Sequence, residues 1–183
     1  MKNKREFIIT GILLSVGIAA VYFFIQSNIP LGKQITQSPK TQAHQSTSES
    51  NSLSSTLKAA IERVKQEGYT VWTVDNFESD EISPLNVLIG IETGSADWYT
   101  QRAFFFYKGK YLGTDASSSS AGVGLKWRND KTIALEYELY HPNESMCCRT
   151  AGSKIVRFQW DGTILTALDP IPTDKWNADL SRR

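Results

Sequence analysis

The pattern of apolar and polar residues divides most of the chain into three stretches. Residues 7–25 form an apolar run without a charged residue, whereas Ser, Thr, Gln, Pro and Lys dominate residues 26–53. In residues 54–172 the apolar positions recur at the spacings of helices and strands. The pattern predicts a membrane span, a disordered polar linker that cannot bury enough surface to fold, and one folded domain.

The apolar run has the features of an uncleaved signal-anchor. Its length approaches the roughly 20 residues that a transmembrane helix needs, and no small-residue cleavage site follows it. Residues 1–6 carry Lys2, Lys4 and Arg5. Because basic residues stay on the cytoplasmic side, we expect a cytoplasmic basic tip, contact with the lipid bilayer through residues 7–25, and an extracytoplasmic domain. A cleaved signal peptide is the alternative.

A helical period follows the polar linker, from residue 54 to about residue 67. The apolar residues of this segment share one helix face: Leu57, Ala60, Ile61 and Val64. Charged residues occupy the opposite face, and Gly68 is a suitable residue to end the helix in the left-handed conformation. We therefore predict one amphipathic helix that packs its apolar face on a sheet.

Beyond Gly68 the pattern is that of strands. Residues 87–91 are continuously apolar, residues 103–107 are aromatic, and apolar and polar residues alternate in three later segments (123–127, 133–139 and 156–160). Turn signals such as Lys108-Gly109 and Asp161-Gly162 separate neighbouring segments closely enough for hairpins. We predict an α+β fold with one helix on an antiparallel β-meander sheet of about five to six strands. Residues 173–183 have no such pattern, and we expect this tail to fray.

Composition and charge exclude several functions. The formal charge of +1 gives no reason to expect a nucleic-acid partner. The sequence has no phosphate loop, dinucleotide fingerprint or zinc-protease motif, so we expect no cofactor and assign no catalytic residue. Glu136 and Glu138 share one strand face and could serve a wall-glycan hydrolase, but a solvent-facing strand explains them without catalysis.

Cys147 and Cys148 are the only cysteines in the chain, and they are adjacent. A location outside the membrane permits a disulfide bond between them. The favoured interpretation is structural: a vicinal bond, or two buried thiols, stiffens the turn before the strand at Val156. The alternatives are a thiol-active site assisted by Arg149 and His141, a metal site that includes His141, and intermolecular disulfides.

Other candidate binding residues are aromatic or basic. The candidate binding loop comprises His141, Arg149, Tyr107 and Tyr111. Part of the aromatic cluster Phe104, Phe105, Phe106, Tyr107 and Tyr111 could also be exposed, beside Trp98, Tyr99 and Arg102, and bind an envelope glycan or an envelope protein. Core packing and hairpin pairing are the favoured explanation of this cluster. The leading interpretation is a membrane-anchored, non-enzymatic envelope module that binds or supports a partner, with a thiol-active envelope protein as the alternative.

Three segments carry a family resemblance. They are the hairpin Phe106–Thr114, the Cys147-Cys148 loop with the strand that follows it, and Asp169-Pro170-Ile171-Pro172. Their order resembles the LppP/LprE lipoprotein family of actinobacterial cell envelopes, over roughly residues 54–172. The resemblance implies an envelope location and no particular activity. The chain departs from a lipoprotein in having no lipid-attachment cysteine directly after residues 7–25.

Overall fold

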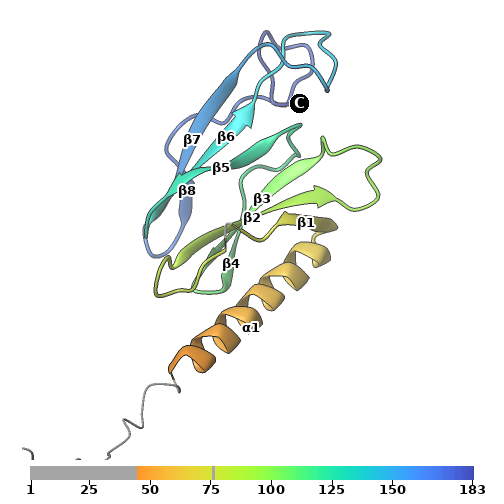
Figure 1. Ribbon diagram of the computed structural model, residues 1–183. Helices are drawn as coiled ribbons and strands as arrows, with labels where there is room; N and C mark the ends of the chain where they lie inside the picture. Colours follow the sequence, from red (N-terminus) through yellow and green to blue (C-terminus); the bar gives the residue numbers. More distant parts are fainter. Residues whose placement is uncertain (1–44, 76) are drawn as a thin grey trace, which may run out of the picture. The chain divides into compact units, whose positions relative to one another are not determined.

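The computed structural model describes residues 45–75 and 77–183, which comprise one helix followed by strands (Figure 1). The predicted basic tip (1–6), the predicted membrane span (7–25) and the linker up to residue 44 lie outside the described residues. In the part that is described, no helix is both long enough and apolar enough to cross a bilayer.

The helix α1 (Gln45–Gln66) begins earlier than predicted and ends as predicted. Residues 45–53, assigned to the linker from their composition, belong to this helix. No proline or glycine interrupts the segment, so a helix can continue through residues that show no apolar period. At its end, Gly68 has a φ of 87° and donates its backbone N–H to the Lys65 carbonyl, which confirms the predicted terminus.

The first four strands form an antiparallel meander sheet. They are β1 (Tyr69–Thr73), β2 (Leu85–Glu92), β3 (Gln101–Tyr107) and β4 (Lys110–Thr114), in that spatial order. The turn between β3 and β4 has positive φ at Lys108 (48°) and Gly109 (70°), as expected for a tight hairpin. One face of this sheet packs against α1 through Ala60, Val64, Leu88, Phe104 and Phe106.

The remaining strands form a second sheet, so the prediction of a single sheet of five to six strands is wrong. They are β5 (Val123–Arg128), β6 (Thr132–Glu138), β7 (Ser153–Trp160) and β8 (Leu165–Ala167), again an antiparallel meander. β4 and β5 do not pair, because the connection between them crosses from one sheet to the other. The α+β class and the helix-on-meander arrangement are confirmed.

The two sheets enclose a second apolar layer, which gives the first sheet two covered faces. Phe104 and Phe106 point to α1, whereas Phe105 points to the second sheet, where its ring lies 5.0 Å from that of Phe158. β2 is buried on both sides for the same reason. Each such phenylalanine stabilises the fold by roughly 1.5–3 kcal/mol when fully buried. The outer face of the second sheet, by contrast, is partly exposed, as the alternating burial of β7 shows.

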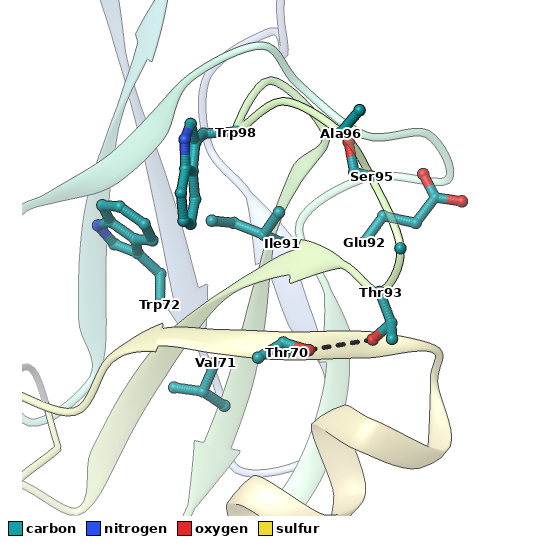
Figure 2. A pocket seen from close by; sticks show the side chains of 10 residues that line it. Thr70, Val71, Trp72, Ile91, Glu92, Thr93, Ser95, Ala96 and Trp98 are labelled. Atoms are coloured by element: carbon teal, nitrogen blue, oxygen red, sulfur yellow. Dashed lines mark hydrogen bonds between the residues drawn. The ribbon is translucent and has the colours of Figure 1, made fainter.

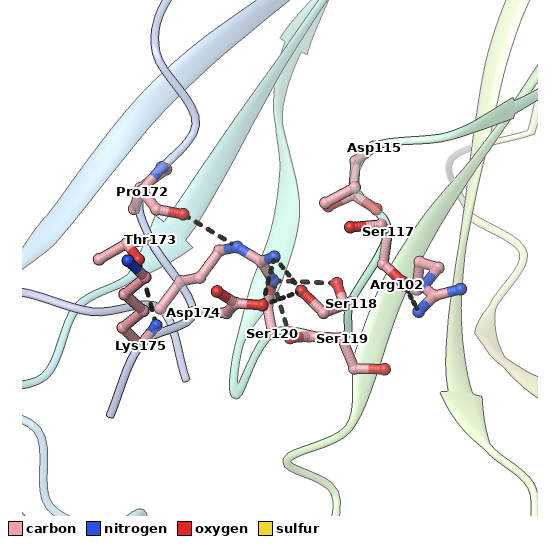
Figure 3. A network of polar contacts seen from close by, with 12 residues as sticks. Arg102, Asp115, Ser117, Ser118, Ser119, Ser120, Pro172, Thr173, Asp174 and Lys175 are labelled. Carbon is pink, nitrogen blue, oxygen red and sulfur yellow. Dashed lines mark hydrogen bonds and ion pairs between the residues drawn. The ribbon is translucent and has the colours of Figure 1, made fainter. Parts of the chain in front are cut away.

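The tail is packed on the domain, contrary to the expected fraying. Arg182 is only 3% exposed, and its guanidinium group donates hydrogen bonds to the carbonyls of Pro172, Ser118 and Ser119 (Figure 3). Ser181 forms a β-bridge with Tyr140. Buried arginines held by backbone carbonyls leave no apolar period in the sequence, which is why pattern analysis missed this contact.

Candidate functional site

An open groove of ≈ 400 Å³ lies between the β2–β3 connection (93–100) and the outer face of the second sheet. Its lining includes Trp98, Tyr99, Gly122, Gly124, Glu136, Glu138, Arg149 and Ser153. We call this the polar groove. It joins residues from four separate parts of the chain, and two of them, Glu138 and Arg149, form an ion pair at 3.1 Å.

Two glycines form the floor of the polar groove. In β5, Val123 and Leu125 belong to the inter-sheet layer, so Gly124 faces outward, where it pairs with Glu136 of β6. A Cβ atom on Gly124 would meet only open space, whereas a Cβ atom on Gly122 would lie 2.5 Å from the Glu138 carboxyl carbon. The carboxylate of Glu138 therefore occupies the space that a side chain at position 122 would fill.

The charged side chains of the polar groove are paired but remain partly exposed. Glu136 accepts hydrogen bonds from Ser153 (2.7 Å) and Lys126 (3.0 Å), and these two contacts lower the pKa of its carboxyl group. Glu138 accepts a hydrogen bond from the Tyr140 hydroxyl at 3.2 Å. The pKa of the Tyr140 hydroxyl is raised to about 12, mainly because the hydroxyl is partly buried and secondly because the charge of Glu138 is close to it. Glu136 is thus ionised and Tyr140 is protonated at neutral pH.

Gln101 connects the loop that carries Trp98, which forms one wall of the polar groove, to the strand that carries the glycine floor. The Gln101 side-chain amide donates to the Trp98 carbonyl at 2.9 Å and accepts from the Val123 N–H at 3.0 Å. The backbone of Gln101 also pairs with Ser120, directly before the floor glycines. Within the wall, the Ser95 hydroxyl donates to the Asp97 carbonyl at 2.7 Å. These contacts hold Trp98 in place although its side chain is 61% exposed.

Trp98 also lines a second cavity of ≈ 250 Å³, which we call the tryptophan cleft. Figure 2 shows Trp72, Trp98 and Ile91 gathered on one side of β1 and β2, with Val71 pointing away. The two indole rings meet edge to face, with centroids 4.6 Å apart. At the other end of the cleft, the hydroxyls of Thr70 and Thr93 are hydrogen-bonded at 3.1 Å.

The cysteine loop borders the polar groove. Cys147 and Cys148 are exposed and joined by a disulfide, with Cα atoms 3.8 Å apart, and no free cysteine occurs in the described residues. Arg149, the next residue, reaches the groove through its ion pair with Glu138. Glu144 closes the loop by accepting from the backbone N–H groups of His141 (2.7 Å) and Thr150 (2.8 Å).

The residues of the predicted binding loop are not brought together. Arg149 lines the polar groove. His141 belongs to the same loop, but its ring contacts the carbonyl of Asp179 and does not line the groove. Tyr107 ends β3 at the side opposite Gln101 and packs against Trp160, with ring centroids 5.5 Å apart. Tyr111 packs on Phe104 and Phe106 under α1. In the described part of the chain, no group of three metal-ligating side chains forms, which gives no support to a metal site at His141.

Sequence reasoning missed Gln101 and the two glycines of the floor. Gln101 carries no chemical signature, because its role depends on which segments its amide reaches. The glycines did offer a signal: Gly122 and Gly124 alternate with Val123 and Leu125, so one strand face lacks side chains.

Comparison with known proteins gives one match. No curated protein and no solved structure shows significant similarity to the chain. A family model matches residues 78–163, which contain β2 to β7, both cysteines and every residue named above as lining the polar groove. A family of lipoproteins implies a membrane-associated location in the cell envelope. Over these residues the chain matches the LppP/LprE lipoprotein family, as the resemblance of its sequence predicted.

Proposed function

We propose that the protein is a non-enzymatic envelope module that binds a wall glycan in the polar groove. The observation that carries the proposal is the exposed Trp98 ring beside the half-exposed Glu138–Arg149 ion pair, above a floor of glycines. A large exposed indole held by hydrogen bonds to its own loop contributes little to the core, so a binding role explains it better.

The chemistry of the groove suits a sugar. Sugars present apolar C–H faces, which pack on aromatic rings, and hydroxyl groups, which both donate and accept hydrogen bonds. Glu136, Glu138 and Arg149 already have partners, yet a carboxylate accepts about four hydrogen bonds and a guanidinium donates five. Their remaining capacity points into an open groove, and no large desolvation penalty opposes a neutral ligand there.

The carboxylates do not favour a hydrolase. Glycoside hydrolysis requires one protonated carboxyl group with a raised pKa to donate to the leaving group. The hydrogen bonds from Ser153 and Lys126 lower the pKa of Glu136, and Glu138 is paired with Arg149. A groove with two compensated carboxylates can hold a sugar but is poorly equipped to cleave one.

The location is part of the proposal. We infer that residues 7–25 span the membrane once, with the amino terminus inside and residues 45–183 outside, where wall glycans lie. Protease added to intact cells should then degrade the folded domain. Survival of the domain in intact cells, together with its loss after permeabilisation, would contradict this topology.

Titration calorimetry with a tetramer of N-acetylglucosamine tests the groove. Gly124→Leu places a side chain in the open space of the floor and should weaken binding at least about tenfold. Gln159→Leu introduces the same residue at an exposed β7 position that does not line the groove, and should bind as the wild type does. Equal affinities for the two variants would contradict the proposal.

A thiol-active role is the second candidate, favoured by the exposure of the Cys147–Cys148 disulfide beside Arg149. Such a protein must exchange its disulfide with a dithiol, through a mixed disulfide, to give two thiols and an oxidised partner. Thiol titration of the folded domain after treatment with a mild dithiol tests it. Sulfurs that resist reduction until the protein unfolds would rule out this role.

A further inference from the structure

We propose that the tryptophan cleft is a second subsite of the same site, so that the protein binds an extended polysaccharide chain rather than a single sugar. This inference rests on the proposed function, because it takes the ligand of the polar groove to be a glycan. It goes further by assigning the class of ligand, a polymer, and a second set of binding residues headed by Trp72.

The two cavities are adjacent because Trp98 lines both of them. A ligand unit packed beside Trp98 in the polar groove therefore has its neighbour at the entrance of the tryptophan cleft. Trp72 lies on the other side of this entrance and is 54% exposed, although it is among the largest apolar side chains in the domain. Two exposed indoles in contact form a continuous apolar surface that follows the ion-paired groove.

The lining of the cleft suits an uncharged sugar unit. Ile91 contributes apolar surface next to the two indoles, and Thr70, Thr93 and Ser95 contribute hydroxyl groups. Hydroxyls can donate to and accept from the hydroxyls of a sugar, whose C–H face would contact an indole. The polar groove differs because three charged side chains line it, Glu136, Glu138 and Arg149, whereas among the described residues Glu92 is the one charged residue that lines the cleft. One uncharged polysaccharide could therefore place one sugar unit in the polar groove and the next unit in the tryptophan cleft.

An added peptide strand fits this surface less well. β1 is the edge strand of the first sheet and could in principle pair with a peptide. However, the pairing of β1 with β2 is irregular between Val71 and Thr73, at the position of Trp72. Such irregularities twist an edge and interrupt a ladder of backbone hydrogen bonds. The cleft is lined across β1 and β2 by side chains, as a glycan subsite requires.

The test measures affinity as a function of chain length, with N-acetylglucosamine oligomers from the disaccharide to the hexasaccharide. In the wild type, affinity should rise at least about tenfold once the chain is long enough to occupy both cavities. Trp72→Ala should remove this gain, measured against the disaccharide affinity of the same variant, and Trp72→Phe should restore part of it. Trp176→Ala removes an equally exposed indole (54%) that lines neither cavity, and should keep the gain.

Each outcome has a distinct meaning. Binding that is independent of chain length in the wild type, or a gain that survives Trp72→Ala, overturns the second subsite and leaves the proposed function intact. No binding of any oligomer contradicts the proposed function itself. Binding of an envelope protein that depends on Trp72, without glycan binding, assigns the cleft to a protein partner and overturns the inference. Thermal melting of each variant separates loss of contact from loss of fold.

Discussion

Gly122 and Gly124 leave the floor of the polar groove open because neither residue has a side chain. The two positions lie on one strand face and have ordinary φ angles, yet their surroundings differ. Gly122→Ala should displace the Glu138 carboxylate and disturb its ion pair with Arg149, at a cost of up to about 1 kcal/mol of stability, because the end of the glutamate side chain can move aside. Gly124→Ala should be neutral or stabilising by up to about 1 kcal/mol. Urea denaturation of both variants measures the difference, and equal stabilities would contradict the described floor.

Asp169 gives a prediction about pH. Hydrogen bonds from Arg157 lower the pKa of Asp169 from 3.8 to about 2. A carboxyl group whose pKa is lower in the folded state contributes stability above its unfolded pKa, and this contribution disappears as the pH falls through the folded value. Arg157→Gln should therefore raise the titration midpoint of Asp169 toward 3.8 in an NMR pH series. An unchanged midpoint would show that Arg157 is not the cause.

Single residues could be predicted only where their chemistry is unusual. The adjacent cysteines and Arg149 stood out in the sequence, and the structure places Arg149 in the groove. Tyr107 and Tyr111 were selected for their aromatic character, but both rings pack against other aromatic residues: Tyr107 against Trp160 and Tyr111 against Phe104. Side chains of a strand point alternately to its two faces, and both faces of the first sheet are covered. The sequence cannot say which aromatic residue remains exposed, because exposure depends on coverage by a second sheet.

Among the larger elements, the loop that carries the cysteines is held by more than its disulfide. Glu144 accepts the N–H groups of His141 and Thr150, at the two ends of the loop. Glu144→Ala should accelerate hydrogen exchange at both amides, because each loses its acceptor. The double variant Cys147→Ser with Cys148→Ser should leave both amides protected and cost only about 1 kcal/mol, since the disulfide closes a minimal loop. If exchange became faster in the cysteine variant and not in Glu144→Ala, the disulfide and not Glu144 would be what holds the loop in place.

The tail also behaves as a structural element. Arg182 is nearly fully buried and donates to the Ser118 and Ser119 carbonyls and to the Ser120 hydroxyl (2.8 Å), in the segment that leads into the groove floor. Arg182→Ala should lower the free energy of unfolding by roughly 2–4 kcal/mol, because three partly buried carbonyls and the Ser120 hydroxyl lose a charged donor. Lys175→Ala, at an exposed site in the same tail, should change it by less than about 0.5 kcal/mol. Similar values in denaturant titrations would contradict the packed tail.

For the whole molecule, the number of sheets could not be read from the hydrophobic pattern. Alternation predicted β5, β6 and β7 as strands, and it placed the apolar faces of β6 and β7 correctly. On β5 the register shifts after Leu125, which leaves Trp127 exposed instead of on the predicted apolar face. Which strands pair depends on the path of the connection between β4 and β5, and periodicity carries no information about that path. One signal was present: the continuous apolar run of β2 is typical of a strand that is covered on both faces.

The central claim is that the surface around Trp98 binds a glycan, and the indole signals of the protein test it most directly. The five tryptophans provide five indole N–H resonances in a ¹⁵N-labelled sample. Saturation with the N-acetylglucosamine hexasaccharide should shift the signals of Trp98 and Trp72, while those of Trp160 and Trp176 stay in place, since neither lines a cavity described above. A Trp98 signal that stays unchanged at saturation would contradict the account.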